Sequence, residues 1–297
     1  MCVGETSFVN TENANSLVGD GRELDLLFQF DIMDMDGEGS KWNAIPLDVP
    51  KLKRIVAAWQ GAIDWNTLFL GNHDQPRVVS RFGDTSSEEL WKRSAKCLAA
   101  LMYLQRGTPF IYQGEELGMT NAPFETREQL RDVEELNLLA LCSSEAELEW
   151  AWRGIKAKGR DNARTPMQWS AGKNAGFTTG EPWIMLNPNY TDINAEAEEG
   201  DPDSILNYYR ALIALRNSTP ALLRGDWREL LPESGQVVAY TRGLDGEEYA
   251  VLCNLSRESA PLPCRLGDFG EPVLSNMPAD PAAGTLRPYE AQVLKKG

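Results

Sequence analysis

Residues 66–77, NTLFLGNHDQPR, decide the predicted fold. The apolar run in this stretch predicts a buried strand, and a polar turn that holds His73, the only histidine, follows it directly. A helical pattern over 87–105 and a second apolar strand over 108–118 come next. The order strand, helix, strand predicts a parallel α/β sheet, in which functional residues sit at the carboxyl ends of the strands.

The same alternation extends to both sides of this stretch. Residues 25–30, DLLFQF, predict a strand, and residues 51–61 place apolar side chains on one helix face. Residues 204–217 predict a further helix that ends before Pro220. Residues 119–203 are rich in Asn, Pro, Gly and acids without a dominant period, so we predict a long functional or partly disordered connection there.

From residue 221 onward the pattern is typical of strands. Residues 237–256, VVAYTRGLDGEEYAVLCNLS, form two alternating runs around Asp245-Gly246, a strong hairpin signal. We therefore predict two domains, an α/β domain over 1–220 and an all-β domain over 221–297.

Composition narrows the possible partners. The net charge of −15 argues against nucleic acid and anionic membrane, and it is compatible with a neutral, polyol-like substrate. The chain contains no apolar stretch of about 20 residues, and its first residues, MCVGETSFVN, lack the features of a signal peptide. Five cysteines without a CxxC pair, together with one histidine, predict no disulfide framework, no metal site and no cofactor. Scattered cysteines without a disulfide framework favour a reducing compartment, the cytoplasm.

Three polar stretches are candidates for chemistry. Asp74, flanked by His73 and near Arg77, is expected to be ionised and able to stabilise a cationic transition state or to bind sugar hydroxyls; a structural histidine is the alternative. Glu5 is either the end of a strand or a solvated acid. Residues 159–169, GRDNARTPMQW, form either an ion-paired loop or a loop over a pocket. The sequence has no GxSxG motif, so serine nucleophile chemistry is poorly supported.

Five ordered motifs resemble the oligo-1,6-glucosidase and alpha-glucosidase branch of the alpha-amylase family, glycoside hydrolase family 13. The motifs are NHDQPRVVSRFG (72–83), GTPFIYQGEELGMTN (107–121), GRDNARTPMQW (159–169), NAGFTTGEPW (174–183) and NPNY (187–190). The resemblance implies the C-terminal half of a (β/α)8 TIM barrel, strands five to eight, over 1–220. An all-β sandwich domain would follow over 221–297.

The resemblance also implies roles for individual residues in a retaining glycoside hydrolase. Glu5, in the motif VGE at the end of the fifth barrel strand, would be the general acid/base. Asp74, at the end of the seventh, would stabilise the transition state. Four further residues would bind the substrate, an oligosaccharide or disaccharide α-glucoside: His73, Phe30, Glu134 and Arg164.

One departure from the family pattern changes the expected activity. The family carries its nucleophilic aspartate in a motif like DGFRMDV, and this sequence contains no such motif. We therefore expect a C-terminal portion of the enzyme that hydrolyses no glucoside alone. A missing N-terminal half-barrel is its expected partner, and residues 1–217 are expected to form a marginal, aggregation-prone fold because four strands cannot close the barrel.

Two alternatives remain open at this stage. The chain could be a non-catalytic interaction module, or half of an enzyme complemented by a second chain. The substrate is also open among those of oligo-1,6-glucosidase, maltase-like alpha-glucosidase, dextran glucosidase and trehalose-6-phosphate hydrolase. Residues 28–36, FQFDIMDMD, favour the first by resemblance, whereas sucrose isomerases and trehalose synthases fit less well.

Overall fold

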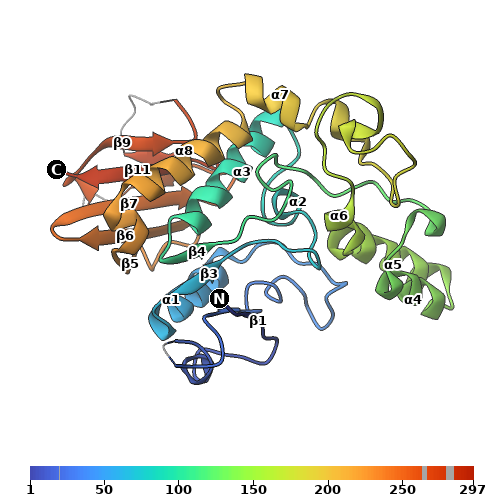
Figure 1. Ribbon diagram of the computed structural model, residues 1–297, viewed down its shortest axis with the longest axis horizontal. Coiled ribbons are helices and arrows are strands. Elements are labelled where there is room, and N and C mark those ends of the chain that lie inside the picture. The colour runs from blue at the N-terminus through green and yellow to red at the C-terminus, as the bar shows by residue number, and fades with distance from the viewer. Residues whose placement is uncertain (20, 263–265, 279–283) are drawn as a thin grey trace.

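Four short strands, paired two by two in parallel, form the centre of the N-terminal part of the molecule, and Figure 1 labels β1, β3 and β4. The computed structural model describes residues 1–19, 21–262, 266–278 and 284–297. Strand β1 (Val3–Glu5) pairs with β2 (Leu26–Phe28), and β3 (Asn66–Leu68) pairs with β4 (Gly107–Pro109), both in parallel. This confirms the predicted parallel α/β arrangement.

Strands β2 and β3 lie side by side without a regular backbone ladder among the described residues. Thr67 links the two strands, because its hydroxyl donates a hydrogen bond to the carbonyl of Leu27 at 2.8 Å. The ring of Phe28 meets that of Phe69 edge to face, with the ring centroids 4.8 Å apart. The four strands therefore follow one another in sequence order, as strands of an open barrel do.

The predicted helices are present and begin at polar caps. Helix α1 (Val49–Ala62) starts after Asp48, and helix α3 (Glu88–Tyr103) starts after Ser87; both cap side chains accept from the backbone of the first turn. Helix α8 (Ile205–Ser218) follows the same rule. Pro220 ends α8 as predicted, but it also begins a further helix, α9 (Pro220–Arg224), because proline is well suited to a first helical position.

The prediction of an irregular connection over 119–203 was wrong in part. Two substantial helices lie there, α4 (Val133–Leu141) and α5 (Glu145–Lys158). Helix α5 begins with a capping box formed by Ser144 and Glu147, a signal present in the sequence. The remaining short helices are α2 (Val78–Phe82), α6 (Asp161–Arg164), α7 (Ala195–Gly200), η1 (Ala14–Ser16), η2 (Arg127–Gln129), η3 (Lys173–Gly176) and η4 (Pro188–Thr191).

The C-terminal part is a five-stranded antiparallel sheet in the order β5-β6-β7-β11-β9. Its strands are β5 (Asp226–Leu230), β6 (Val237–Leu244), β7 (Glu247–Asn254), β9 (Phe269–Ser275) and β11 (Ala291–Lys296), and a separate pair is formed by β8 (Ala260–Pro261) and β10 (Thr285–Leu286). The predicted hairpin at Asp245-Gly246 is confirmed. Both turn residues have positive φ, 52° and 87°, as a two-residue type I′ turn requires.

The central strands β6 and β7 of the five-stranded sheet are buried on both faces. Along β6, Val238 and Tyr240 belong to the core shared with α3 and α8, and Val237 and Ala239 belong to a second core that includes residues of β8 and β10. The larger core therefore runs without interruption from the barrel strands to the sheet. The predicted domain boundary at 220 stays a prediction, and the strands themselves begin at Asp226.

Two expectations from composition concern the whole chain. No helix in the described ranges is long and apolar enough to cross a membrane. Cys2, Cys97, Cys142 and Cys253 are free thiols, and Cys264 lies outside the described residues.

Candidate active site

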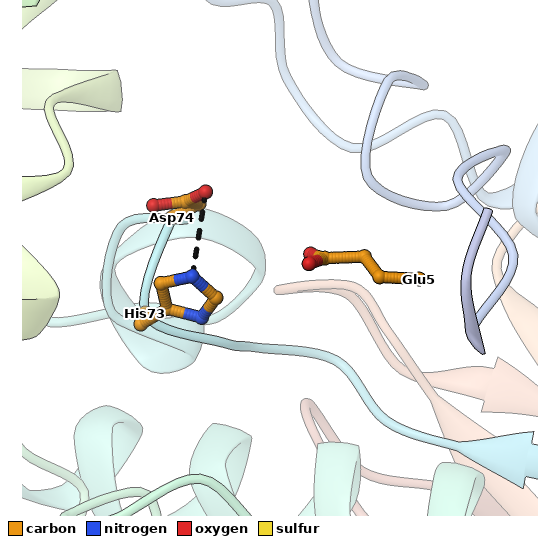
Figure 2. Close-up of side chains that lie close together, drawn as sticks. All are labelled: Glu5, His73 and Asp74. Carbon is orange, nitrogen blue, oxygen red and sulfur yellow. Dashed lines mark ion pairs between the residues drawn. The ribbon is translucent and has the colours of Figure 1, made fainter. Parts of the chain in front are cut away.

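Three of the predicted site residues converge from the ends of two separate strands. Glu5 ends β1, and its carboxylate points toward His73 and Asp74 in the loop after β3 (Figure 2). One polar side-chain atom of each residue lies within 4.8 Å of the other two. Glu5 is exposed, and the side chains of His73 and Asp74 are 59% and 35% exposed, so the cluster is accessible to a ligand.

The loop after β3 orients Asp74 by local hydrogen bonds. The side-chain oxygen of Asn72 accepts from the backbone N–H of Asp74 at 2.8 Å, an Asx turn that turns the chain sharply after the strand. Asp74 Oδ2 lies 3.5 Å from Nε2 of His73. The imidazole and the carboxylate thus share one face of the loop.

Arg164 connects this loop to α6. Its guanidinium donates to Asp74 Oδ1 at 2.7 Å and to the carbonyl of His73 at 3.1 Å. It also donates to Oδ2 of Asp132 at 2.6 Å. Arg164 therefore fixes both the backbone and the carboxylate of the His73-Asp74 pair.

Arg160 and Arg164 link Asp74 to Asp132. This ion-pair network, here called the arginine bridge, was not identified from the sequence. Arg160 donates to both oxygens of Asp132, at 2.6 and 3.0 Å, and reaches Asp74 Oδ1 at 3.4 Å. Burial raises the pKa of Asp132, but the hydrogen bonds from Arg160 and from the backbone N–H of Glu134, together with the charges of Arg160 and Arg164, outweigh it, so the pKa lies below its ordinary value. The i, i+4 spacing of the two arginines was the available signal, because it places both on one helix face.

The buried side chain of Arg77 forms hydrogen bonds with the same loops. Its guanidinium donates to the carbonyls of Asn162 (3.0 Å) and Gln113 (2.6 Å), and its own backbone N–H donates to the side chain of Asn121. Burial lowers its pKa to about 10, so it stays charged at neutral pH. The loops after β3 and β4 and the start of α6 are therefore joined beneath the candidate site.

The other two predicted substrate-binding residues lie outside the three-residue cluster. Glu134, in the first turn of α4, forms an ion pair with Lys41 and lies 3.6 Å from Arg160. Its side chain is 41% exposed, at the rim beside the arginine bridge. Phe30 follows β2 and is half-buried against the main core. Direct contact of either residue with a sugar remains a prediction.

Glu115, which follows β4, is buried away from solvent. Its Oε1 accepts hydrogen bonds from the hydroxyls of Tyr103 and Tyr209. Burial raises its pKa to about 7, despite these hydrogen bonds. Glu115 belongs to the interior of the barrel rather than to the exposed cluster around Glu5.

Among the residues that the structure describes, two groups of side chains bring oxygen or nitrogen atoms close enough to hold a cation: Glu5, His73 and Asp74, and the buried Asp132, Glu135 and Asp161. In the first group, two arginine guanidinium groups already contact Asp74, and their positive charge opposes a cation. In the second, both oxygens of Asp132 accept from arginines. Neither of these two donor sets offers the several free carboxylate and carbonyl oxygens from which a Ca²⁺ site is built.

Comparison with known proteins tests the resemblance independently. The family model of the alpha amylase catalytic domain matches residues 1–225. A probable oligo-1,6-glucosidase of Bacillus subtilis (strain 168) is 43% identical over 307 residues, covering 99% of this chain and 54% of that protein. A trehalose-6-phosphate hydrolase of Escherichia coli (strain K12) is 41% identical, and the match covers 98% of this chain and 54% of that protein.

Solved structures agree with the sequence relatives. A trehalulose synthase from Pseudomonas mesoacidophila MX-45 matches with a TM-score of 0.90 and 40% identity, over 99% of this chain and 55% of that one. The chain spans about half the length of the relatives it matches and corresponds to their C-terminal portion. With the resemblance confirmed over nearly all of its residues, the chain belongs to the alpha-amylase family.

Proposed function

We propose that this chain supplies the general acid/base and the transition-state-stabilising aspartate of a retaining α-glucosidase site, Glu5 and Asp74. The observation that carries the proposal is the convergence of Glu5, His73 and Asp74 within 4.8 Å from two separate strand ends. Their exposure supports contact with a ligand, and the oligo-1,6-glucosidases among the relatives support the type of reaction.

Each residue has a distinct task in this proposal. Glu5 donates its proton to the glycosidic oxygen as the bond to the anomeric carbon breaks, and later accepts a proton from the attacking water. Asp74 binds sugar hydroxyls more tightly as the ring flattens and becomes cationic. His73 donates a hydrogen bond to the same ring, and Arg164 holds Asp74 in place.

A retaining mechanism also needs an attacking carboxylate about 5–5.5 Å from the acid. This sequence contains no motif like DGFRMDV, in which the family carries that aspartate. We propose that the nucleophile comes from the part of the relatives that this chain does not span. The 297 residues alone would then hydrolyse no α-glucoside.

Isomalto-oligosaccharides are the proposed substrates. Several relatives at 42–43% identity are oligo-1,6-glucosidases, and the FQFDIMDMD stretch at 28–36 favours the same group. Trehalose 6-phosphate and sucrose are the alternatives to test, because a hydrolase of the first is among the relatives and a related enzyme has been solved with the second. A cytoplasmic location is part of the proposal and rests on cysteine usage.

The proposal is tested by complementation. The chain is co-expressed with the N-terminal portion of the Bacillus subtilis relative, and hydrolysis of isomaltose, maltose, sucrose, trehalose 6-phosphate and p-nitrophenyl α-glucoside is measured. We expect activity only from the pair, with isomaltose preferred. Glu5→Gln should reduce isomaltose hydrolysis by about 10²–10⁴-fold.

Leaving-group dependence separates the acid role from a structural one. p-Nitrophenolate departs without protonation, so Glu5→Gln should impair cleavage of the nitrophenyl glucoside less than cleavage of isomaltose. Asp74→Asn should impair both equally, and Glu12→Gln, at an exposed glutamate later in the same N-terminal segment, should impair neither. Substantial turnover by the chain alone that Glu5→Gln abolishes would contradict the proposal.

A further inference from the structure

Below the arginine bridge lies a cluster of three buried carboxylates, Asp132, Glu135 and Asp161. Their relative exposures are 2%, 0% and 0%, and one oxygen of each lies within 4.8 Å of the others. The cluster joins the start of α4 to the start of α6. Three negative charges at such a depth require compensation, because an unpaired buried carboxylate is very costly.

Asp132 is compensated, whereas the other two residues are not. Both of its oxygens accept from Arg160 or Arg164. Asp161 Oδ2 accepts from the backbone N–H groups of Arg131 and Asp132, and Glu135 Oε1 accepts from the N–H of Asp161. The remaining oxygens, Glu135 Oε2 and Asp161 Oδ1, are buried and have no hydrogen-bond partner within the described part of the chain.

The basic side chains around this pair are engaged elsewhere. Lys41 pairs with Glu134, and Lys158, at the end of α5, pairs with Asp36 at 2.6 Å. The guanidinium of Arg131 donates to three backbone carbonyls, those of Glu128, Leu130 and Trp183. Glu135 and Asp161 therefore lie beside each other and Asp132 without an ion-pair partner among the described residues.

We propose that Glu135 is a neutral carboxylic acid whose proton is shared with Asp161, and that this pair positions Asp132 and its two arginines beneath Asp74. A proton held between Glu135 Oε2 and Asp161 Oδ1 would satisfy both unpartnered oxygens and remove one negative charge. A divalent cation fits less well, since Ca²⁺ takes about six to eight oxygens and only two are free. Burial, followed by the charges of Asp161 and Asp132, raises the pKa of Glu135 to about 8, in agreement with this geometry.

The positioning effect follows from the contacts in order. Asp161 accepts from the N–H of Asp132, Asp132 holds Arg160 and Arg164, and Arg164 holds Asp74 and the carbonyl of His73. Loss of the proton would place a second charge beside Asp132 and compete for its arginines. The expected effect on catalysis through Asp74 rests on the proposed function, whereas the protonation of Glu135 does not.

The first test detects the proton directly. The infrared difference spectrum between wild type and Glu135→Gln, recorded near neutral pH, should contain the C=O stretch of a protonated carboxyl. Glutamine keeps the shape and can donate to Asp161, so the variant should fold. Glu149→Gln, an exposed glutamate on α5, is the matched control and should show no such band. Absence of the band in the Glu135→Gln difference would overturn the proposal.

The second test uses the single histidine as a reporter of the site. NMR signals of the His73 imidazole are followed against pH in the full chain. In wild type and Glu149→Gln we expect an inflection near pH 8 from the Glu135 carboxyl, and in Glu135→Gln its loss. In Asp161→Asn the inflection should move to lower pH, because a neighbouring negative charge is gone. Superimposable curves for wild type and Glu135→Gln would overturn the positioning role.

Neither readout depends on catalysis. If complementation produced no glucosidase while the infrared band and the inflection were present, the proposed function would fail and the proton-sharing pair would stand. Added Ca²⁺ serves as a further discriminator. If it removed the protonated band at neutral pH in wild type, the cluster would be a cation site and the proposal would be overturned.

Discussion

At the scale of single residues, Asp132 is the buried carboxylate around which the candidate site is organised. Both arginines that contact Asp74 also donate to it. The family resemblance pointed to its neighbour Glu134 instead, as a substrate-binding residue. A buried carboxylate that organises arginines leaves no periodic pattern, so only the folded chain identifies it.

Replacing Asp132 should reveal this role in stability. Asp132→Asn keeps the volume but removes the charge that two arginines share, so we expect a loss of about 1.5–3 kcal/mol in the free energy of unfolding. Because the folded-state pKa of Asp132 is lowered, its contribution is present above the ordinary aspartate value of about 4 and disappears as the pH falls through the lower folded-state value.

Urea unfolding at neutral pH and in acid measures the effect. Wild type and Asp132→Asn should differ at neutral pH and converge in acid. Asp64→Asn, an exposed aspartate between α1 and β3, is the control and should match wild type throughout. An unchanged difference in acid would show that the loss comes from packing and not from charge.

At the scale of elements, the pairing of β3 with β4 depends on one glycine. Gly107 opens β4 with φ of 149°, and a Cβ there would clash with the carbonyl oxygen of Asn66, its partner across the pair. Any side chain would force these two strands apart. Strand β3 leads to the His73-Asp74 loop, and its pairing with β4 therefore requires glycine at position 107.

Gly107→Ala should therefore be strongly destabilising. We expect a loss of about 2–4 kcal/mol, in the range of substitutions that impose backbone strain and a clash. Gly61→Ala is the matched control. Gly61 lies in α1, and no neighbouring atom lies within 4 Å of the place that an alanine methyl group would take, so alanine should add about 0.5–1 kcal/mol of stability. Denaturant midpoints measure both changes; equal effects of the two substitutions would refute the steric explanation.

At the scale of the whole molecule, the sheet and the barrel strands share one core. The hydroxyl of Tyr240 donates to the carbonyls of Ala100 and Leu101 in α3, and the buried guanidinium of Arg242 donates to those of Leu104 and Leu222. Figure 1 shows α3 and α8 lying across the sheet. The two parts of the chain therefore stabilise each other.

This shared core predicts a single unfolding transition for the intact chain. Residues 221–297 expressed alone should show no cooperative melt, because the sheet face that packs on α3 and α8 would be exposed to water. Residues 1–217 should aggregate for the same reason, in addition to the open strand edges expected from the sequence. Calorimetry and size-exclusion chromatography test this. A cooperative, monomeric melt of either fragment would contradict the prediction.

The sequence by itself determined the family, the parallel order of the strands, the helices of regular period and the hairpin at Asp245-Gly246. These features depend on local patterns and on contiguous motifs, which a chain displays before it folds. The motifs also supplied Glu5, His73 and Asp74 as candidates. Their convergence was an expectation that depended on which strands lie side by side.

Only the tertiary structure decided how the site is held together. The bridge from Asp74 through Arg164 to Asp132, and the buried pair of Glu135 and Asp161, join segments that are far apart in the chain. Whether a carboxylate is ionised, paired or protonated depends on burial and on the charges around it. These surroundings exist only after the loops after β3 and β4 and the helices α4 and α6 have packed against one another.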